Sequence, residues 1–359
     1  MPWKWTKVSG HSSVSKLGIM SFTRLASRCT PAALVLAIVS ATVFTLSAIA
    51  YRLGRSSDTE LRFLEPGRAP TYDEAFIVCP IEHALRSHDA NDVIFLGDSV
   101  CQHGIDPVRF EKLTGLTAYN LGSRSYFGPN GYWMTARAYL SRHPKPRAIV
   151  LCVCALSFRA DPDFENGAVP RRFTEAYGPE IGSVAPQDSF LPFVRFGARA
   201  LGNWISPQAD IRDLPLDGMQ KETFRTLRQR TDASHGQLAL EGPHGPFKVV
   251  ERAPDDDILI RDEWDWGVGK LAEECASAGV PFLIRFCPLS TDFKETRDYS
   301  ALQRWADGFA KRYPQTSIGR PILLWYDPSL SWDRVHLNAA GVKKFMPLVA
   351  KDVQAALSR

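Results

Sequence analysis

The chain carries little net charge and lacks the residue clusters of several functional classes. Its net charge is +4, and residues 1–31 contribute +5 because they hold five basic side chains and no acidic one. The remainder therefore has a net charge of −1 and no basic excess with which to bind a nucleic acid. It also contains neither an internal repeat nor a low-complexity tract, which excludes a repeat architecture.

Cysteines are few, and they are not arranged as metal-binding pairs. Seven occur, and Cys152 with Cys154 forms a lone C-x-C without the second pair that a zinc site needs. We expect most of them to be small buried hydrophobic residues; export would permit a disulfide, but no spacing demands one. Because nothing resembles a nucleotide-binding motif either, the sequence predicts a protein without a metal or cofactor.

Charged residues are also absent from Ala32–Ala50, a stretch of 19 residues. A helix of that length can cross a bilayer. We predict a cytoplasmic basic tail (1–31), a single-pass signal-anchor in the inner membrane (32–51), a linker and entry segment (52–90) and a periplasmic or extracellular domain (91–359). Ala48-Ile49-Ala50 also matches the pattern of a signal-peptidase site, so release of the domain after Ala50 is the alternative.

Beyond the linker, strand patterns alternate with helix patterns. The chain is 45% hydrophobic, enough for a core, and its continuous apolar runs predict buried strands. Such alternation is typical of a parallel sheet with helices on both faces, an α/β fold. The predicted strands are residues 93–96, 117–121, 148–155, 280–286 and 322–326. The predicted helices are residues 107–114, 131–142, 264–278, 301–312 and a last helix capped by Asn338.

Residues 158–260 interrupt this alternation. They contain many prolines and glycines together with scattered aromatic residues. A structureless loop of that length is improbable inside a compact domain. We predict an inserted lid or subdomain beside the carboxyl edge of the sheet. A purely structural insertion is an equal alternative, since aromatic residues more often fill a core than line a groove.

Two distant motifs hold the groups of a nucleophilic triad. Ser99 stands in Gly97-Asp98-Ser99, directly after the first predicted strand, whereas Asp333 and His336 lie in a loop before the last helix. A serine hydroxyl is a poor nucleophile unless a histidine takes its proton and a carboxylate orients that histidine. An isolated Gly-Asp-Ser would suit any turn. The pair of motifs together predicts a triad of Ser99, His336 and Asp333.

These motifs resemble those of the GDSL/SGNH hydrolase superfamily. Gly97-Asp98-Ser99 matches its first motif, and Asp333-x-x-His336 matches its last. The resemblance covers roughly residues 90–157 and 262–357, in fragments. It implies a three-layer α/β/α flavodoxin-like domain and an acyl-enzyme on Ser99. It also implies two oxyanion donors: the Ser99 N–H, and Gly122, which matches the superfamily's glycine after the second strand.

The chain departs from the superfamily at the third oxyanion donor. The usual G-x-N-D after the third strand is replaced by C-A-L-S-F-R-A-D, and Ser157 or a group from the insertion is the candidate substitute. His103 and Arg124 are further candidates for contact with the substrate. A surface position for His103 and a solvated or ion-paired role for Arg124 are the alternatives. Cys101 is a much weaker candidate for the nucleophile.

The predicted function is serine-dependent acyl-ester chemistry on a carbohydrate. Exported, membrane-anchored members of the superfamily include O-acetyltransferases and esterases of envelope polysaccharides. The resemblance therefore implies O-acetyl transfer to an envelope or extracellular polysaccharide, or its deacetylation, with a membrane-bound O-acyltransferase as candidate protein partner. The missing asparagine motivates the alternative, a non-catalytic carbohydrate-binding or scaffold subunit of a polysaccharide-modification complex.

Overall fold

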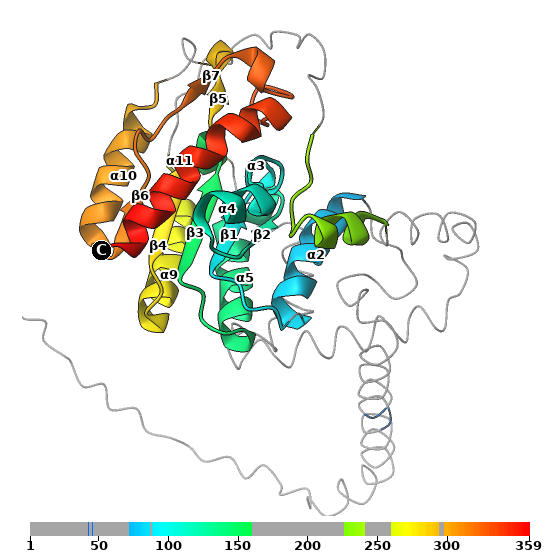
Figure 1. Ribbon diagram of the computed structural model, residues 1–359. Helices are drawn as coiled ribbons and strands as arrows, with labels where there is room; N and C mark the ends of the chain where they lie inside the picture. The colour runs from blue at the N-terminus through cyan, green and yellow to red at the C-terminus, as the bar shows by residue number, and fades with distance from the viewer. Residues whose placement is uncertain are drawn as a thin grey trace, which may run out of the picture.

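A five-stranded parallel sheet forms the centre of the protein (Figure 1). The computed structural model describes residues 42, 45, 72–86, 88–159, 226–240, 260–293 and 298–359. The strand order across the sheet is β2-β1-β3-β4-β6, and every pairing is parallel. This confirms the predicted α/β class and is consistent with a flavodoxin-like fold. The strands are β1 (Val93–Gly97), β2 (Ala118–Gly122), β3 (Ala148–Val153), β4 (Phe282–Phe286) and β6 (Thr316–Ile318).

Helices cover both faces of the sheet, which is why strands β1 to β4 are buried along their whole length. On one face, α5 (Gly128–Arg142) packs against α9 (Asp262–Ala278) and α2 (Tyr72–Arg86). On the other face, α11 (Ala339–Leu357) packs against α3 (Ser99–Gly104) and α4 (Pro107–Thr114). Helix α10 (Ser300–Arg312) lies beside β6. The result is a layer of strands between two layers of helices.

The prediction for the last strand is wrong. The fifth strand of the sheet is β6, whereas residues 322–326 contribute only β7 (Trp325–Tyr326). Strand β7 pairs with β5 (Leu289–Ser290) in a separate two-stranded sheet. The cause is position: β6 is a short edge strand that contains Thr316 and Ser317, so it lacks the apolar run by which central strands are recognised. Other predicted boundaries differ from the observed ones by a few residues.

Most of the predicted membrane span lies outside the described residues. Two of its residues, Thr42 and Thr45, are described and are helical. Within the described ranges, no helix is long and apolar enough to cross a membrane. Most of the predicted insertion also lies outside those ranges, apart from residues 158–159, 226–240 and 260.

The described part of the insertion packs at the β2 edge of the sheet. Residues 226–233 are helical, and the chain then runs beside β2. The Asn120 N–H donates to the His235 carbonyl at 2.8 Å, and the Leu238 N–H donates to the Gln102 carbonyl at 3.1 Å. The insertion thereby satisfies backbone groups of β2 and α3 that would otherwise face outward.

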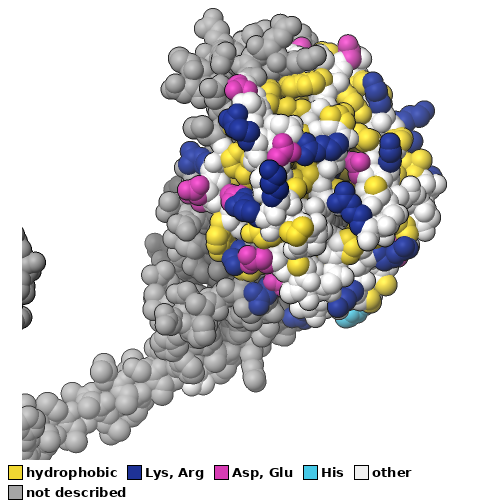
Figure 2. All heavy atoms as spheres, turned by 90° about the vertical axis from the view of Figure 1, so that its left-hand side faces the viewer, with side chains coloured by type: hydrophobic (Ala, Val, Ile, Leu, Met, Phe, Trp, Pro, Cys, Tyr) yellow, Lys and Arg dark blue, Asp and Glu magenta, His cyan; other side chains and the backbone are white. Residues whose placement is uncertain are grey.

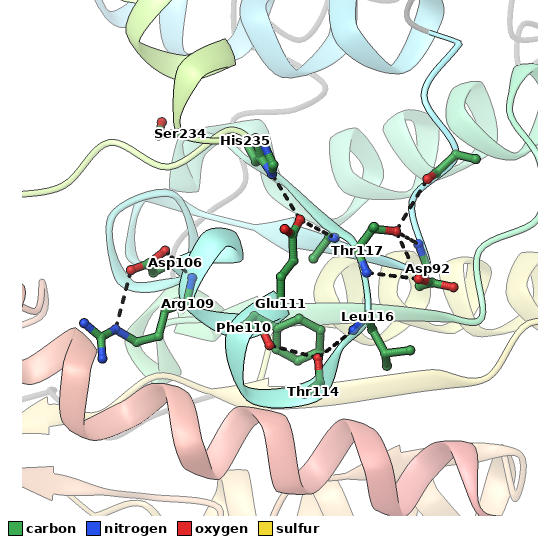
Figure 3. Close-up of polar contacts among 12 residues, drawn as sticks. Asp92, Asp106, Arg109, Phe110, Glu111, Thr114, Leu116, Thr117, Ser234 and His235 are labelled. Atoms are coloured by element: carbon green, nitrogen blue, oxygen red, sulfur yellow. Dashed lines mark hydrogen bonds and ion pairs between the residues drawn. The ribbon is translucent and has the colours of Figure 1, made fainter.

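Polar side chains tie the insertion to α4, and others join the starts of β1 and β2 (Figure 3). His235 Nδ1 lies 3.1 Å from Glu111 Oε1 on α4. Nearby, the N–H and the hydroxyl of Thr117 donate to Asp92 Oδ2 at 2.9 and 3.0 Å. The bonds between Thr117 and Asp92 join the beginnings of β1 and β2.

The surface over α10 carries charges of both signs. Figure 2 shows basic, acidic and apolar side chains interspersed on this face. Ion pairs join Arg312 to Asp265 and Arg320 to Asp307. On the part of this face that the structure describes, some of the basic side chains are therefore paired with acidic ones.

Gly97 ends β1 in a conformation that few other residues adopt. Its φ is +149°, and a Cβ at this position would lie 1.7 Å from the Cys152 carbonyl oxygen and 2.9 Å from Cys101 Cβ. The absence of a side chain therefore lets β1 approach β3 closely and turn at once into α3. Because α3 begins at Ser99, this turn also sets the position of the predicted nucleophile.

We expect Gly97→Ala to lower the free energy of unfolding by about 3 kcal/mol or more, because the methyl group overlaps a buried carbonyl and keeps an unfavourable φ. The matched control is Gly308, where a Cβ would meet nothing within 4 Å. Gly308→Ala lies inside α10 and should stabilise the protein by about 0.5–1 kcal/mol. Urea unfolding of the purified variants measures both effects. A Gly97→Ala protein as stable as the wild type would contradict the close packing.

Candidate active site

Ser99 is the first residue of α3 and stands at the carboxyl end of β1, with a partly exposed side chain. Asp98 caps the helix, since its Oδ1 accepts a hydrogen bond from the Val100 N–H at 3.1 Å. In an open parallel sheet, ligands bind outside the carboxyl ends of the strands. The β1–α3 turn therefore presents the Ser99 hydroxyl at the edge where substrates of α/β proteins bind.

Two hydrogen bonds connect Ser99 to His336 and His336 to Asp333. Ser99 Oγ lies 2.9 Å from His336 Nε2, although the two residues are 237 positions apart. His336 Nδ1 lies 2.6 Å from Asp333 Oδ2. Since the carboxylate can only accept, Nδ1 carries the proton and Nε2 is left to accept from the Ser99 hydroxyl. The structure thus brings the three predicted triad residues together, in the geometry that general-base activation of a serine requires.

Asp333 is held in place by its own loop. Its Oδ1 accepts hydrogen bonds from the Val335 and His336 N–H groups, both at 2.7 Å. Burial by itself would raise the pKa of this carboxyl. The hydrogen bond and charge of His336 and the two backbone bonds outweigh burial, and they hold the pKa of Asp333 below its usual value. Asp333 therefore stays ionised and orients the imidazole.

The loop around Asp333 and His336 is closed at its base. Ser331 and Leu337 form an antiparallel bridge, and the Trp332 N–H donates to the His336 carbonyl at 2.8 Å. Asn338 then caps α11 as predicted, its Oδ1 accepting from two backbone N–H groups at 3.0 Å. His336 is thereby attached to the start of a long, packed helix rather than to a free loop.

Asp98 is a buried structural carboxylate, and it engages Ser157. Its Oδ2 accepts from the Cys154 N–H at 2.9 Å and from Ser157 Oγ at 2.6 Å. Burial raises the pKa of Asp98, although these hydrogen bonds act in the opposite direction. The Ser157 hydroxyl proton is therefore directed to Asp98 and is not available to an oxyanion. Its observed role is to tie the loop after β3 to the turn that carries Ser99.

The Gly122 N–H also has a partner within the fold. It donates to Asn120 Oδ1 at 2.8 Å. A Cβ at Gly122 would lie 2.5 Å from the Gln102 backbone nitrogen, so α3 packs against β2 too closely for a side chain. The absence of a side chain at Gly122 therefore allows α3 to pack closely against β2. The Gly122 N–H donates to Asn120 rather than to an oxyanion.

Among the predicted oxyanion donors, the Ser99 N–H is the one that no other group of the described residues engages. It opens α3, where the first N–H groups have no acceptor inside the helix. Among the described residues it has no hydrogen-bond partner. An N–H at this position, on the residue that carries the nucleophile, is suited to an oxyanion that develops beside Ser99 Oγ.

Asn120 positions the helix that carries Ser99, and the sequence patterns did not single it out. Its side chain is fully buried in β2, and Nδ2 donates to the carbonyls of Cys101 at 2.9 Å and Ile105 at 3.0 Å. These carbonyls belong to the end of α3, where helices leave acceptors unsatisfied. The available signal was an amide among apolar strand residues, A-Y-N-L-G.

Cys101 does not compete with Ser99 as a nucleophile. The thiol is fully buried, and its Sγ lies 3.4 Å from Asn120 Oδ1. Burial raises the pKa of Cys101 well above its usual value, so the reactive thiolate is suppressed.

The two candidate substrate contacts lie in different surroundings. His103 is not on the surface: it is 7% exposed, and its ring centroid lies 5.3 Å from that of His336. The surface alternative for His103 is therefore wrong. Arg124 is partly buried and places its guanidinium carbon 4.1 Å from the centre of the Phe76 ring, a cation–π contact.

A cavity of about 490 Å³ lies away from the triad, among α2, α4 and residues 228–235. None of the triad residues lines this cavity. The candidate site is therefore identified by the hydrogen bonds among Ser99, His336 and Asp333 and not by a cavity. Within the described ranges, no group of three His, Cys, Asp or Glu side chains could hold a metal ion.

A scan against protein-family models finds no match for the chain, and a search of curated proteins finds no relative.

Asp98→Asn should lower the free energy of unfolding by about 1–3 kcal/mol, because an amide nitrogen cannot accept from the buried donors that face the carboxylate. Asp106 is the matched control, since it caps α4 through one bond to the Arg109 N–H at 2.9 Å. Asparagine caps helices as well as aspartate, so Asp106→Asn should stay within about 0.5 kcal/mol of the wild type. Urea unfolding compares the two, and equal costs would contradict the structural role of Asp98.

Proposed function

We propose that the protein is a serine-dependent esterase or acyltransferase that forms an acyl-enzyme on Ser99. The observation that carries the proposal is the continuous hydrogen-bonded path from Ser99 Oγ through His336 to Asp333. The same two motifs support a place in the GDSL/SGNH superfamily. Turn, helix and loop contacts hold all three groups, so the arrangement belongs to the folded scaffold.

The first half-reaction needs only these groups. His336 Nε2 takes the proton of Ser99 as Oγ attacks the carbonyl carbon of an ester, and Asp333 stabilises the imidazolium that results. The Ser99 N–H donates to the oxyanion. The C–O bond to the alcohol then breaks, and His336 returns the proton to the leaving oxygen. Ser99 is left as an ester of the acyl group, most simply acetyl.

In the second half-reaction, water or a carbohydrate hydroxyl attacks the acyl-enzyme. His336 takes the proton of the attacking hydroxyl, the bond from the acyl carbon to Oγ breaks, and the proton goes to Ser99. One oxyanion donor contributes about 3 kcal/mol to such a reaction. The engagement of Gly122 and Ser157 inside the fold therefore supports a slow enzyme, whether the acceptor is water or a carbohydrate hydroxyl.

The proposed substrate is an acyl ester of an envelope or extracellular polysaccharide. This follows from the superfamily resemblance and from the apolar segment Ala32–Ala50, which we propose anchors the domain on the outer side of the inner membrane. A membrane-bound O-acyltransferase is the proposed partner, because it would deliver acyl groups across the same membrane.

The second candidate is a non-catalytic carbohydrate-binding or scaffold subunit. It is favoured by the partners that Gly122 and Ser157 have within the fold, which leave the expected oxyanion site with fewer donors. The intact hydrogen bonds among Ser99, His336 and Asp333 support the enzyme instead.

Ser99→Ala and His336→Ala should each slow hydrolysis of p-nitrophenyl acetate by about 1000-fold or more, because the nucleophile and base act as a unit. The matched control is Cys101→Ala, which removes the thiol two residues away and should leave most of the activity. The full-length protein in mild detergent is assayed for p-nitrophenol release. Unchanged activity in Ser99→Ala would exclude Ser99 as nucleophile. Absence of a fluorophosphonate adduct on Ser99 of the folded protein would favour the binding role.

Alkaline phosphatase fused after residue 60 should be active and should sediment with membranes. The basic tail opposes its own translocation, since it holds five basic residues against Arg52 and Arg55 on the other side. An inactive, cytoplasmic fusion would contradict both the topology and the envelope function. An active but soluble fusion would indicate cleavage after Ala50.

A further inference from the structure

His103 stands beside the catalytic base without belonging to the triad. It lies four residues after Ser99 on α3, so both side chains project from the same side of the helix. Its ring meets that of His336 edge to face, with centroids 5.3 Å apart and planes at 84°. His103 is 7% exposed, and its ring therefore closes one side of the His336 imidazole to water.

The insertion holds His103 in this position. His103 Nδ1 lies 2.6 Å from the Leu238 carbonyl oxygen. Because a carbonyl only accepts, Nδ1 carries the proton. Two more bonds join the same segments: the Leu238 N–H donates to the Gln102 carbonyl at 3.1 Å, and Gln237 Nε2 donates to the His103 carbonyl at 3.3 Å. Residues 237–238 are thus attached to the turn of α3 that follows the nucleophile.

We propose that His103 is a positioning residue: anchored by the Leu238 carbonyl, its ring packs against His336 and keeps Nε2 directed at Ser99. The inference rests on the proposed acyl-enzyme function, since it assigns His103 a role toward the base of that reaction. It also gives the described part of the insertion a role in catalysis that requires no contact with substrate.

The charge state of His103 suits this role. An imidazolium forms on His336 during acylation, and a second cation at this distance would oppose it. Burial, His336 and Arg124 favour neutral His103, whereas the Leu238 carbonyl and Asp333 favour the charged form; the balance lowers the pKa of His103 to about 4. Its pKa in the folded protein is thus below the ordinary 6.5. The stability that neutral His103 provides is complete above pH 6.5 and is lost as pH falls toward 4.

The test compares His103 with His143 in the full-length protein. His143 is equally buried, and its ring nitrogens lie 3.1 and 3.0 Å from the carbonyls of Asp89 and Ala84, at the end of α5. His103→Ala should lower kcat for p-nitrophenyl acetate by about 10-fold or more, with KM changed less than about 2-fold, because the loss falls on the chemical step. His143→Ala should change neither kcat nor KM.

Two further variants separate the ring from the anchor. His103→Phe keeps the ring but loses the bond to the Leu238 carbonyl, so its kcat should lie between those of the wild type and His103→Ala. His103→Asn keeps a donor near Nδ1 without the ring and should resemble His103→Ala. If the alanine variant does not fold, the comparison of the phenylalanine and asparagine variants decides. The inference is overturned if His103→Ala or His103→Asn matches His143→Ala in kcat.

A proton NMR measurement keeps this inference separate from the proposed function. The His336 Nδ1 proton, shared with Asp333 at 2.6 Å, should give a low-field signal in the wild type and in His143→Ala. His103→Ala should lose that signal through exchange with water. If the wild-type protein neither hydrolyses esters nor is labelled on Ser99 by a fluorophosphonate, the proposed function is wrong. The low-field signal of the His336 Nδ1 proton would still show whether His103 positions His336. A signal unchanged in His103→Ala would overturn the positioning role.

Discussion

The buried carboxylate of Asp98 is the contact on which the site depends most. It accepts hydrogen bonds from the turn that follows β1 and from the loop that follows β3, so one side chain joins two strand ends. Burial of a carboxylate is costly unless its oxygens are satisfied, and here three donors satisfy them. With that contact in place, α3 can begin at Ser99, Asn120 can engage the end of the helix, and His336 finds the hydroxyl at hydrogen-bond distance.

The central layers of the fold were predictable because their signals are local. The apolar runs of β1 and β3 are required by burial on both faces, and the predicted helix 107–114 coincides with α4, which has Pro107 in its first turn. Strand β6 was missed because an edge strand that contains Thr316 and Ser317 has no such run. A nearby apolar segment, residues 322–326, competed for the assignment and instead pairs outside the main sheet.

The candidate site was predictable only in part. Ser99, Asp333 and His336 could be named because each stands in a motif whose chemistry is recognisable without coordinates. The sequence could not show which N–H and O–H groups are free to donate to an oxyanion. The partners of Gly122 and Ser157 depend on which buried groups lie next to each other in the folded chain. His103 presented the same difficulty: its acceptor, Leu238, lies 135 residues further along the chain, in a segment that interrupts the α/β pattern.

The contact between Leu238 and α3 has a consequence for how such a domain can vary. Both groups that Leu238 offers to α3 are backbone groups, an N–H and a carbonyl. Every residue except proline supplies both, so these two bonds to α3 do not depend on which apolar side chain fills the buried position of Leu238. A comparison of sequences that looks for invariant side chains would therefore not detect these two backbone bonds. An insertion or deletion that shifts the path of this backbone would disturb the site without changing any residue in the triad.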